Sequence, residues 1–455
     1  MRGARAFLDF CTKFRKIFSP ASGMEEALKP PSLVANMKVL DKELFNKEIE
    51  LPYIGVADNK VSDILPKMKK YLLRVDHYKP ISRLDDNIVL FLNPLKVGRW
   101  EDLEETDRNY LVGKNIDAHL FKFHKEVLKY NNYSAEDVLR AVLPKDKEGM
   151  ASFTKIGHIV HVNLREHLLP YKNVIGEVLF DKVSGCRTVV NKVNMIDNTY
   201  RNFQMEILCG EEDFVAKLKE NKCTFEFDFS KVYWNSRLCT EHERIVDLVG
   251  TEDVLFDVFA GVGPFSVPVA KKKCPVFAND LNPESYKWLK HNAKINKIGD
   301  NLSMSNKDGK DFILNEVKDK LLGFVKERKR VFVVMNLPAL AVEFLGAFNG
   351  LYSDVQRVEM DTPPTIYVYC FAKGEEPEEI ARRLVVENFG WDVSAKILEV
   401  FRVRTVSSMK EMMRVAIRLD EDILWGSKKR KSSDGEDILQ NKKNRGNGEE
   451  EGKEM

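Results

Sequence analysis

The second half of the chain alternates short apolar runs with segments that have apolar residues at helical spacing. The apolar runs are residues 254–256, 274–278, 331–335 and 365–371. Runs of this length between turns are typical of strands buried on both faces of a parallel sheet. Residues 241–249 and 284–297 have the spacing of amphipathic helices. The alternation predicts an α/β fold.

A glycine turn follows the first of these strands. Residues 254–265 read V-L-F-D-V-F-A-G-V-G-P-F, which places Asp257 at the carboxyl end of the strand and Gly261 and Gly263 in the turn. Glycines let such a turn approach a ligand at the start of a helix. The dinucleotide fingerprint G-x-G-x-x-G needs a third glycine where this chain has Ser266. The turn instead resembles the AdoMet-binding loop of class I methyltransferases.

Acidic residues follow the next two strands. Asp280 comes after residues 274–278, where a carboxylate can accept both hydroxyls of a ribose, and Leu281 adjoins it. Asp308 and Gly309 fall where a third strand should end. Asp280 could instead cap the following helix. We expect Asp280, Leu281, Asp308 and Gly309 to line a nucleoside site.

The fourth strand ends at Asn336, within the sequence N-L-P-A. Base methyltransferases place the target atom against an Asn or Asp at this point. Those that act on amino groups usually add a proline and an aromatic residue, where this chain has Leu337 and Ala339. Those that act on carbon need a cysteine nucleophile, and Cys370 lies within an apolar strand. Methylation of a ring nitrogen is favoured.

Taken with Y-R-N-F-Q-M-E and V-Y-W-N-S-R-L-C-T-E-H upstream, these motifs resemble the eukaryotic and archaeal tRNA (guanine-37-N1)-methyltransferases over roughly residues 155–419. The resemblance implies a class I, Rossmann-like α/β methyltransferase domain preceded by α+β RNA-recognition domains. It implies AdoMet as cofactor and methyl transfer to N1 of the guanine at position 37, 3′ of the anticodon, which protects the reading frame. The implied partner is tRNA with G at position 37, bound by a monomer.

The same resemblance implies site residues. Arg201, Glu241 and Asn336 would be catalytic, and His242 would lie beside the cofactor with Asn336. Guanine N1 carries a proton that a general base must remove, and a carboxylate suits this role. Negative charge builds on O6 during methyl transfer, and a guanidinium suits its stabilisation. Without the resemblance, Arg201 and Glu241 would be interpreted as a structural ion pair or as exposed residues, and His242 as a cap or packing residue. Ser236 departs from the family, which has a proline there.

Two rival functions stay open. A wybutosine-pathway enzyme of the same fold would transfer the aminocarboxypropyl group of AdoMet, which N-L-P-A disfavours. A catalytically silent tRNA-binding protein would have no need of Arg201, Glu241 and Asn336 together.

The composition of the chain limits the possible compartments, metal sites and membrane spans. The chain has 455 residues, a net charge of +2 and seven cysteines. That charge alone does not indicate nucleic-acid binding, and scattered cysteines indicate a reducing compartment. The histidines lack partners at metal-ligand spacing, so no metal site is expected. The apolar stretch 331–348 is broken by polar residues and a proline and predicts strand, turn and helix, not a membrane span.

Local clusters supply further expectations. Basic residues near the last strands are predicted to meet phosphates: Arg402, Arg404, Lys410 and Arg414. A second cluster is explained by a solvated helix face: Lys67, Lys69, Lys70 and Arg74. Tyr233 and Trp234 lie in a strand-like run, which favours core positions over stacking on RNA bases.

Five segments are predicted. Residues 1–23 have the basic, phenylalanine-rich composition of a mitochondrial transit segment. Residues 24–148 form the variable amino-terminal domain that the family resemblance assigns to tRNA recognition, with strands at 47–51 and 87–91 and helices at 61–73 and 135–143. Residues 149–250 form a middle domain that carries Arg201, with a strand at 156–162 and a helix at 164–176, so that the active site would close between domains.

Residues 251–424 are predicted to form the domain that binds AdoMet. Residues 425–455 form a disordered tail whose basic run at 428–431 is a possible nuclear signal. The expected locations are the mitochondrial matrix, nucleus and cytoplasm.

Overall fold

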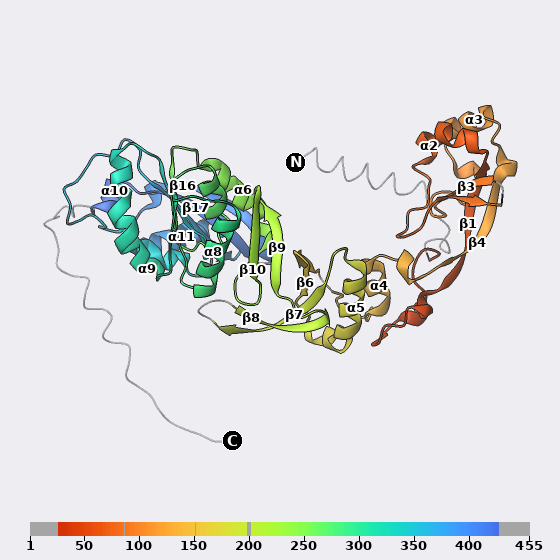
Figure 1. Cartoon of the computed structure of the whole chain (residues 1–455), viewed down its shortest axis with the longest axis horizontal. Coiled ribbons are helices and arrows are strands. Elements are labelled where there is room, and N and C mark those ends of the chain that lie inside the picture. The colour runs from red at the N-terminus through yellow and green to blue at the C-terminus, as the bar shows by residue number, and fades with distance from the viewer. Residues whose placement is uncertain (1–25, 86, 151, 198–201, 427–455) are drawn as a thin grey trace, which may run out of the picture. The chain divides into compact units, whose positions relative to one another are not determined.

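The computed structural model describes residues 26–85, 87–150, 152–197 and 202–426. The predicted transit segment, the catalytic candidate Arg201 and the chain from residue 427 onward lie outside these ranges. The chain divides into two compact units, Met1–Thr240 and Glu241–Met455 (Figure 1). Each unit is described by itself.

The first unit begins with an antiparallel sheet of order β2-β3-β1-β4. Its strands are β1 Lys47–Val56, β2 Ile81–Leu84, β3 Asn87–Phe91 and β4 Phe121–Leu128. The helices that accompany it are α2 Val61–Met68 and α3 Glu105–Gly113, with 3-10 turns η1 Ser32–Val34, η2 Glu43–Phe45, η3 Asp58–Lys60, η4 Trp100–Asp102, η5 Ala118–Leu120 and η6 Tyr130–Asn132. Apolar residues of β1, α2, β3 and α3 form one core cluster.

Two expectations here are confirmed and one is wrong. Strand 87–91 is β3, and strand 47–51 is the first half of β1. The helix predicted over 61–73 ends at Met68. Leu73 donates its amide to Phe91 O at 2.9 Å, so the apolar residues after Met68 pair with β3 instead of continuing the helix.

A second sheet of the first unit has the order β5-β6-β7-β8, with β6 and β7 parallel. Its strands are β5 Thr154–Ile156, β6 Ile159–Val162, β7 Thr188–Asp197 and β8 Asn202–Gly210. The helical elements are α4 Ala135–Val142, η7 Glu166–Tyr171, α5 Lys172–Lys182 and η8 Ser236–Leu238. A hairpin of β9 Val215–Glu220 and β10 Cys223–Asp228 follows. The prediction of a helix at 135–143 is confirmed by α4.

Three expectations for this region need correction. The single strand predicted at 156–162 is a hairpin, because Gly157 turns the chain at φ 59°. The helix predicted at 164–176 starts as the 3-10 turn η7, which contains Pro170, and continues as α5 to Lys182. Tyr233 and Trp234 lie in a loop, not in a strand. Trp234 is buried against Phe227, with ring centroids 5.0 Å apart, whereas Tyr233 is half exposed.

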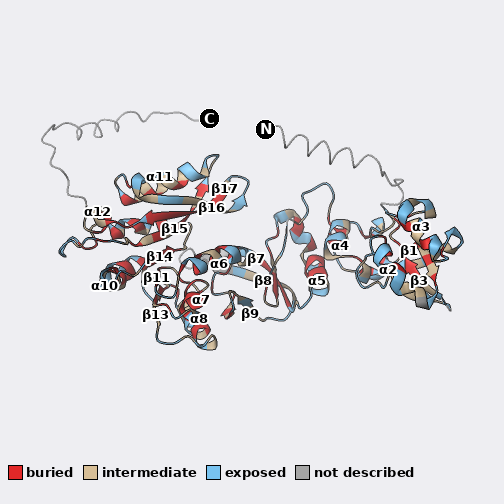
Figure 2. Ribbon diagram, turned by 90° about the horizontal axis from the view of Figure 1, so that it is seen from above, coloured by how far each residue is buried: buried red, intermediate tan, exposed pale blue. Residues whose placement is uncertain are grey.

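The second unit is built on a seven-stranded sheet of order β13-β12-β11-β14-β15-β17-β16. Its strands are β11 Val254–Asp257, β12 Val276–Asn279, β13 Leu302–Ser305, β14 Val331–Met335, β15 Thr365–Lys373, β16 Ile397–Ser407 and β17 Lys410–Arg418. The five strands from β13 to β15 in the sheet order are parallel, and β17 runs antiparallel to both β15 and β16. Much of β15 and β17 is buried (Figure 2).

Helices cover both faces of this sheet. The helical elements are α6 Cys239–Leu248, α7 Ser266–Lys271, α8 Pro283–Ile295, α9 Gly309–Phe312, the π-helical turn η9 Ile313–Val317, α10 Lys318–Lys326, η10 Ala341–Phe348, α11 Pro377–Phe389, η11 Ser394–Lys396 and α12 Glu421–Leu424. Alternate residues of each strand, such as Val254 and Phe256, join one core cluster with α10, η10 and α11. The residues between them, such as Tyr369, face α6. A strand alternates its faces in this way.

The α/β fold predicted from the apolar runs is confirmed. Strand 331–335 is β14, and 365–371 lies within β15. The stretch 331–348 is strand, turn and 3-10 helix, as expected. No helix in the described part of the chain has the length and apolar content needed to cross a membrane.

Candidate functional site

The carboxyl ends of β11, β12, β13 and β14 meet at one edge of the second unit's sheet, because these strands are parallel and nearly in register. Asp257 pairs with Ala278 of β12 and with Val334 of β14. The predicted cofactor residues of the glycine turn, Asp280 and Asn336 therefore lie at a single edge. In open α/β sheets this edge is where ligands bind.

The two glycines of the turn do different work. Gly263 has φ 97°, and a Cβ there would meet Val267 at 2.6 Å and Leu289 at 2.7 Å. Gly261 has φ 56°, and no described atom lies within 4 Å of the position its Cβ would take. Gly263 is therefore needed for packing between the turn, α7 and α8, whereas Gly261 faces open space that a ligand can enter.

Asp280 is bound to the glycine turn. Its Oδ2 accepts from Gly261 N at 2.7 Å and its Oδ1 from Asn282 N at 2.9 Å. Asn282, not Asp280, caps α8 through Glu284 N, so the cap interpretation of Asp280 does not hold. Burial raises the pKa of Asp280 to about 6, and its backbone hydrogen bonds oppose this shift.

Asp257 anchors the helix that follows the turn. It is fully buried, and Ser266 Oγ donates to its Oδ2 at 2.5 Å. Burial raises the pKa of Asp257 to about 7. Ser266, which occupies the position of the third fingerprint glycine, thus holds α7 against the end of β11.

Two asparagines that the sequence interpretation missed join the loops of this edge. Asn279 is fully buried and donates through Nδ2 to Val258 O at 3.2 Å and to Lys307 O at 3.0 Å. Asn306 donates to Asp280 O at 2.7 Å and to Leu281 O at 2.9 Å. The signal for Asn279 was its place directly before Asp280, at the end of a strand.

The remaining nucleoside-site candidates have local roles of their own. Asp308 caps α9 by accepting from Lys310 N at 2.8 Å. A Cβ on Gly309 would lie 2.7 Å from the Phe259 ring, so that glycine permits close packing. Leu281 is partly exposed beside Asp280. Their contact with a cofactor stays a prediction.

Asn336 lies just beyond β14. Its Oδ1 is buried and has no hydrogen-bond partner among the described residues. The turn that carries it is fixed by Phe371 N, which donates to Pro338 O at 3.0 Å. A buried acceptor without a partner is costly, so Asn336 fits a ligand that donates a hydrogen bond here. With Gly261 open and Asp280 beside it, the edge fits a nucleoside cofactor such as AdoMet.

Glu241 is held by three side chains. Its Oε1 accepts from Tyr369 OH at 2.7 Å and from Arg414 Nη1 at 2.9 Å, and its Oε2 is bound by Arg244. Glu241, Tyr369 and Arg414 are all buried. The alternative of a structural ion pair therefore has a concrete form, with Arg244 and Arg414 as the partners in the described part of the chain. The role of Glu241 as base stays a prediction.

Aromatic contacts connect Glu241 to the glycine turn. The ring of His242, the next residue on α6, lies edge-on to Phe265, with centroids 4.9 Å apart. Phe265 is the last residue of the turn before α7, and its ring centroid is 6.4 Å from that of Tyr369. The predicted base and the predicted cofactor loop thus belong to one cluster.

Two expectations about basic residues are wrong. Arg414 was predicted to meet phosphates, but it is 3% exposed and paired with Glu241 and Glu399. Lys70 was placed on a solvated helix face. It is 46% exposed, but it lies in the turn after α2 and not on the helix, and it pairs with Asp107 at 2.7 Å. In both cases a buried carboxylate far away in sequence fixes the cation.

Cysteine and metal chemistry find no support among the described residues. Cys370 is buried within β15, and burial raises the pKa of its thiol to about 12. Such a thiol is a poor nucleophile. Within the described ranges, no group of histidine, cysteine and carboxylate side chains could hold a metal ion.

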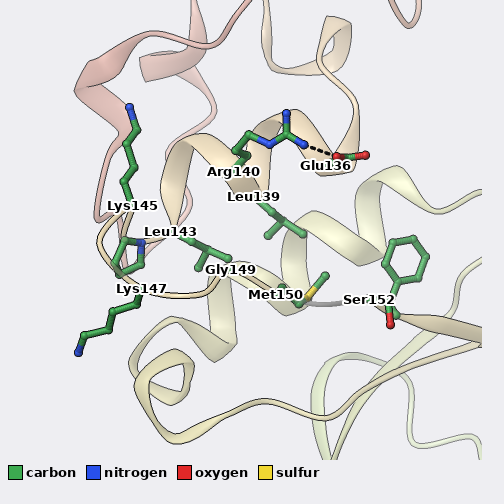
Figure 3. A pocket seen from close by; sticks show the side chains of 11 residues that line it. Glu136, Leu139, Arg140, Leu143, Lys145, Lys147, Gly149, Met150 and Ser152 are labelled. Atoms are coloured by element: carbon green, nitrogen blue, oxygen red, sulfur yellow. Dashed lines mark hydrogen bonds and ion pairs between the residues drawn. The ribbon is translucent and has the colours of Figure 1, made fainter. Parts of the chain in front are cut away.

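A pocket of about 550 Å³ lies in the first unit, beside α4 and the segment after it (Figure 3). Leu139, Leu143 and Met150 give it an apolar lining. The basic residues around it are Arg140, Lys145 and Lys147. Arg140 pairs with Glu136 on α4, whereas both lysines are exposed on the following segment. The pocket combines apolar and cationic surface.

The sheet order, the glycine turn and the carboxylate after β12 define a class I, AdoMet-dependent methyltransferase domain. The TRM5/TYW2 methyltransferase domain matches residues 216–350, and the TYW2 N-terminal domain matches residues 135–213. A tRNA (guanine(37)-N(1))-methyltransferase of Drosophila melanogaster is 48% identical over 405 residues, which are 87% of this chain and 88% of the relative. The Homo sapiens enzyme of the same name is 43% identical over 90% of this chain and 82% of its own. The chain belongs to the tRNA (guanine(37)-N(1))-methyltransferase family.

Solved structures share the fold. Trm5b from Pyrococcus abyssi is similar with a TM-score of 0.56 and 23% identity, covering 81% of this chain and 98% of that one. The complex of aTrm5 and tRNALeu matches with a TM-score of 0.56 and 22% identity, covering 82% of this chain and all of that one. The fold class expected from the sequence is thereby confirmed.

Proposed function

We propose that this chain transfers the methyl group of AdoMet to N1 of guanosine 37 in tRNA. The observation that carries the proposal is the identity of 48% to a relative of that name over most of both chains. The geometry supports it, because a nucleoside-binding edge and a buried carboxylate lie in one cluster of the second unit. The relatives' names favour methyl transfer over the aminocarboxypropyl and silent alternatives.

The chemistry assigned to the site follows from its residues. Asp280 would bind the ribose of AdoMet, and Asn336 would orient the base or the cofactor through its amide. Glu241 would take the N1 proton, and Arg201 would stabilise charge on O6. AdoMet supplies an electrophilic methyl group. His242 and Phe265 border the predicted cofactor loop and shape that side of the site.

A direct assay tests the function. The purified full chain is incubated with labelled AdoMet and unmodified tRNA carrying G or A at position 37. We expect label in the G37 transcript only, and nucleoside mass analysis should identify 1-methylguanosine. A mass corresponding to an aminocarboxypropyl adduct would favour the rival transferase. If no label enters the tRNA, the silent tRNA-binding protein is the function that stays open.

The proposal extends to the state and location of the enzyme. We expect a monomer, for which light scattering should give 52.4 kDa. The basic amino-terminal residues support import into mitochondria, and the basic run at 428–431 supports a nuclear pool beside a cytoplasmic one. Deleting residues 1–20 should abolish mitochondrial import and leave the purified enzyme active. Import that persists in the truncated, tagged protein would refute the transit segment.

A further inference from the structure

The two oxygens of Glu241 have different surroundings. Oε1 accepts from Tyr369 and Arg414, whose side chains are buried. Oε2 is bound by Arg244, whose side chain is 37% exposed. One oxygen is therefore fixed from inside the protein, and the other is covered from the solvent side.

The inner partners are set by the sheet. Tyr369 on β15 pairs with Arg414 on β17, and Arg414 pairs with Phe401 on β16, so the three side chains stand on one face. Arg414 Nη2 also donates to Glu399 of β16 at 2.7 Å. A guanidinium bound to two carboxylates and a phenol hydroxyl inside a strand has little freedom to move.

Tyr369 lies at the level of the reaction edge. Met335 of β14 is in register with Val368 of β15. Tyr369 is therefore level with Asn336, the residue after β14, and its ring lies near Phe265 of the glycine turn. Oε1 of Glu241 is thus tied to a point that the sheet places beside the predicted target position.

The outer partner is more exposed than the inner ones. Arg244 is three residues after Glu241 on α6 and stacks on Phe401 at 4.1 Å. Arg244 is the more exposed partner, at 37% against 3% for Arg414, so water can reach and replace its bond to Oε2 more readily. A nucleobase entering from solvent can therefore displace Arg244 from Oε2 more easily than it can displace Tyr369 or Arg414 from Oε1.

We propose that Tyr369 and Arg414 are positioning residues that hold Glu241 by Oε1, and that Arg244 covers Oε2, the proton-accepting oxygen, until guanine replaces it. This assignment rests on the proposed function. In the step itself the N1–H bond of guanine breaks and its proton passes to Oε2. The N1–C bond to the methyl group forms with the freed electron pair, and the sulfonium sulfur keeps the pair of the broken S–C bond.

Single-turnover methylation of G37 tRNA by the full chain tests the positioning role. Glu241→Gln should slow the step by roughly 10²–10⁴-fold. Tyr369→Phe and Arg414→Lys should each slow it by on the order of 10²-fold, the cost of misplacing a reacting group, with AdoMet affinity unchanged. In the Glu241→Gln background, Tyr369→Phe should cost almost nothing more, because the group it positions is already inactive. Losses that multiply would overturn the assignment.

Arg330→Lys is the matched control. Arg330 binds the buried carboxylate of Asp253 through two hydrogen bonds, at 2.9 and 2.5 Å, at the opposite edge of the same sheet. Arg330 is 56% exposed and Arg414 is 3% exposed, so Arg330→Lys should lower thermal stability less than Arg414→Lys does. It should leave the single-turnover rate unchanged. Equal rates for Arg414→Lys, Tyr369→Phe and this control would also overturn the assignment.

Arg244→Met tests the outer position. Because Arg244 leaves Oε2 before the reaction, the single-turnover rate of this variant at saturating tRNA should stay within a few-fold of the wild type. A rate as low as that of Arg414→Lys would contradict the proposed order. Wild-type enzyme that forms no 1-methylguanosine would contradict the proposed function, and the assignment with it.

Discussion

At the scale of single residues, the site contains two carboxylates whose partners give them different properties. Asp280 accepts from backbone amides, and burial raises its pKa to about 6. Glu241 is bound by two guanidinium groups and a phenol hydroxyl. The amides of Gly261 and Asn282 fix the first carboxylate, whereas Tyr369 and Arg414, far away in sequence, and the nearby Arg244 fix the second.

Asp280→Ala should weaken AdoMet binding by about 1.5–3 kcal/mol, the usual worth of hydrogen bonds to a charged group. Calorimetry with the full chain measures this, and tRNA affinity serves as the internal control because it should hardly change.

The affinity of the wild-type protein for AdoMet should also depend on pH. The ionised carboxylate is the better acceptor, and the pKa is about 6, so binding should weaken as the pH falls through 6 and level off above 7. Unaltered AdoMet affinity in the variant would exclude Asp280 from the site.

The sequence predicted Asp280 and Glu241 but not what holds them. Asp280 follows a strand within N-D-L-N-P, a local pattern that already indicates a ligand position. Tyr369 and Arg414 are 128 and 173 residues from Glu241. Their strands look like ordinary apolar runs, and only sheet pairing brings them to α6. For that reason Arg414 was assigned to phosphates although it lies in the core.

At the scale of elements, the turn between β11 and α7 separates a packing glycine from a ligand-facing one. Strand positions at this edge could be predicted because strands buried on both faces appear as continuous apolar runs. The hairpin of β5 and β6 was missed because its turn interrupts such a run only at Gly157 and His158. The difference between the two turn glycines depends on contacts with α7 and α8, which the sequence alone does not show.

Alanine substitutions should separate the two glycines. Gly263→Ala should destabilise the protein, because a Cβ there would overlap Val267 and Leu289 and φ is 97°. Gly261→Ala meets no described atom and should cost only about 1–2 kcal/mol for its left-handed backbone, but it should lower AdoMet affinity. Thermal unfolding and calorimetry on both variants measure the contrast. Equal losses of stability would show that Gly261 also serves packing.

The pocket beside α4 gives a second prediction at this scale. Lys145 and Lys147 are exposed at its edge, where they can meet RNA phosphates. Replacing both by alanine should weaken tRNA binding and reduce its salt dependence by roughly one unit of slope per lysine. AdoMet affinity should not change. Lys294 and Lys326, exposed lysines outside the segments assigned to tRNA recognition, provide the matched double alanine control. If the salt dependence of tRNA binding has the same slope in this variant as in the control, the two lysines do not contact phosphates.

At the scale of the whole molecule, the chain distributes its predicted functions over two units. Glu241 and the residues predicted to bind the cofactor belong to the second unit, which has its own apolar core. Arg201 and the segments that the family resemblance assigns to tRNA recognition belong to the first. The sequence predicted the fold of the second unit well, because alternating strands and helices specify few topologies. The described part of the first unit contains two four-stranded sheets and a two-stranded hairpin, and local patterns define these pairings less sharply.

This division can be tested with a fragment of residues 241–426. All residues proposed to bind AdoMet lie within it, as does the core of its sheet. The folded fragment should therefore bind AdoMet with an affinity within a few-fold of the full chain. It should form no 1-methylguanosine, because it lacks Arg201 and the proposed tRNA-binding segments. Circular dichroism and thermal unfolding verify that the fragment is folded, and Asp280→Ala should weaken AdoMet binding to the fragment by the same factor as in the full chain. A folded fragment that methylates G37 tRNA at the full-length rate would show that the first unit contributes neither catalysis nor recognition.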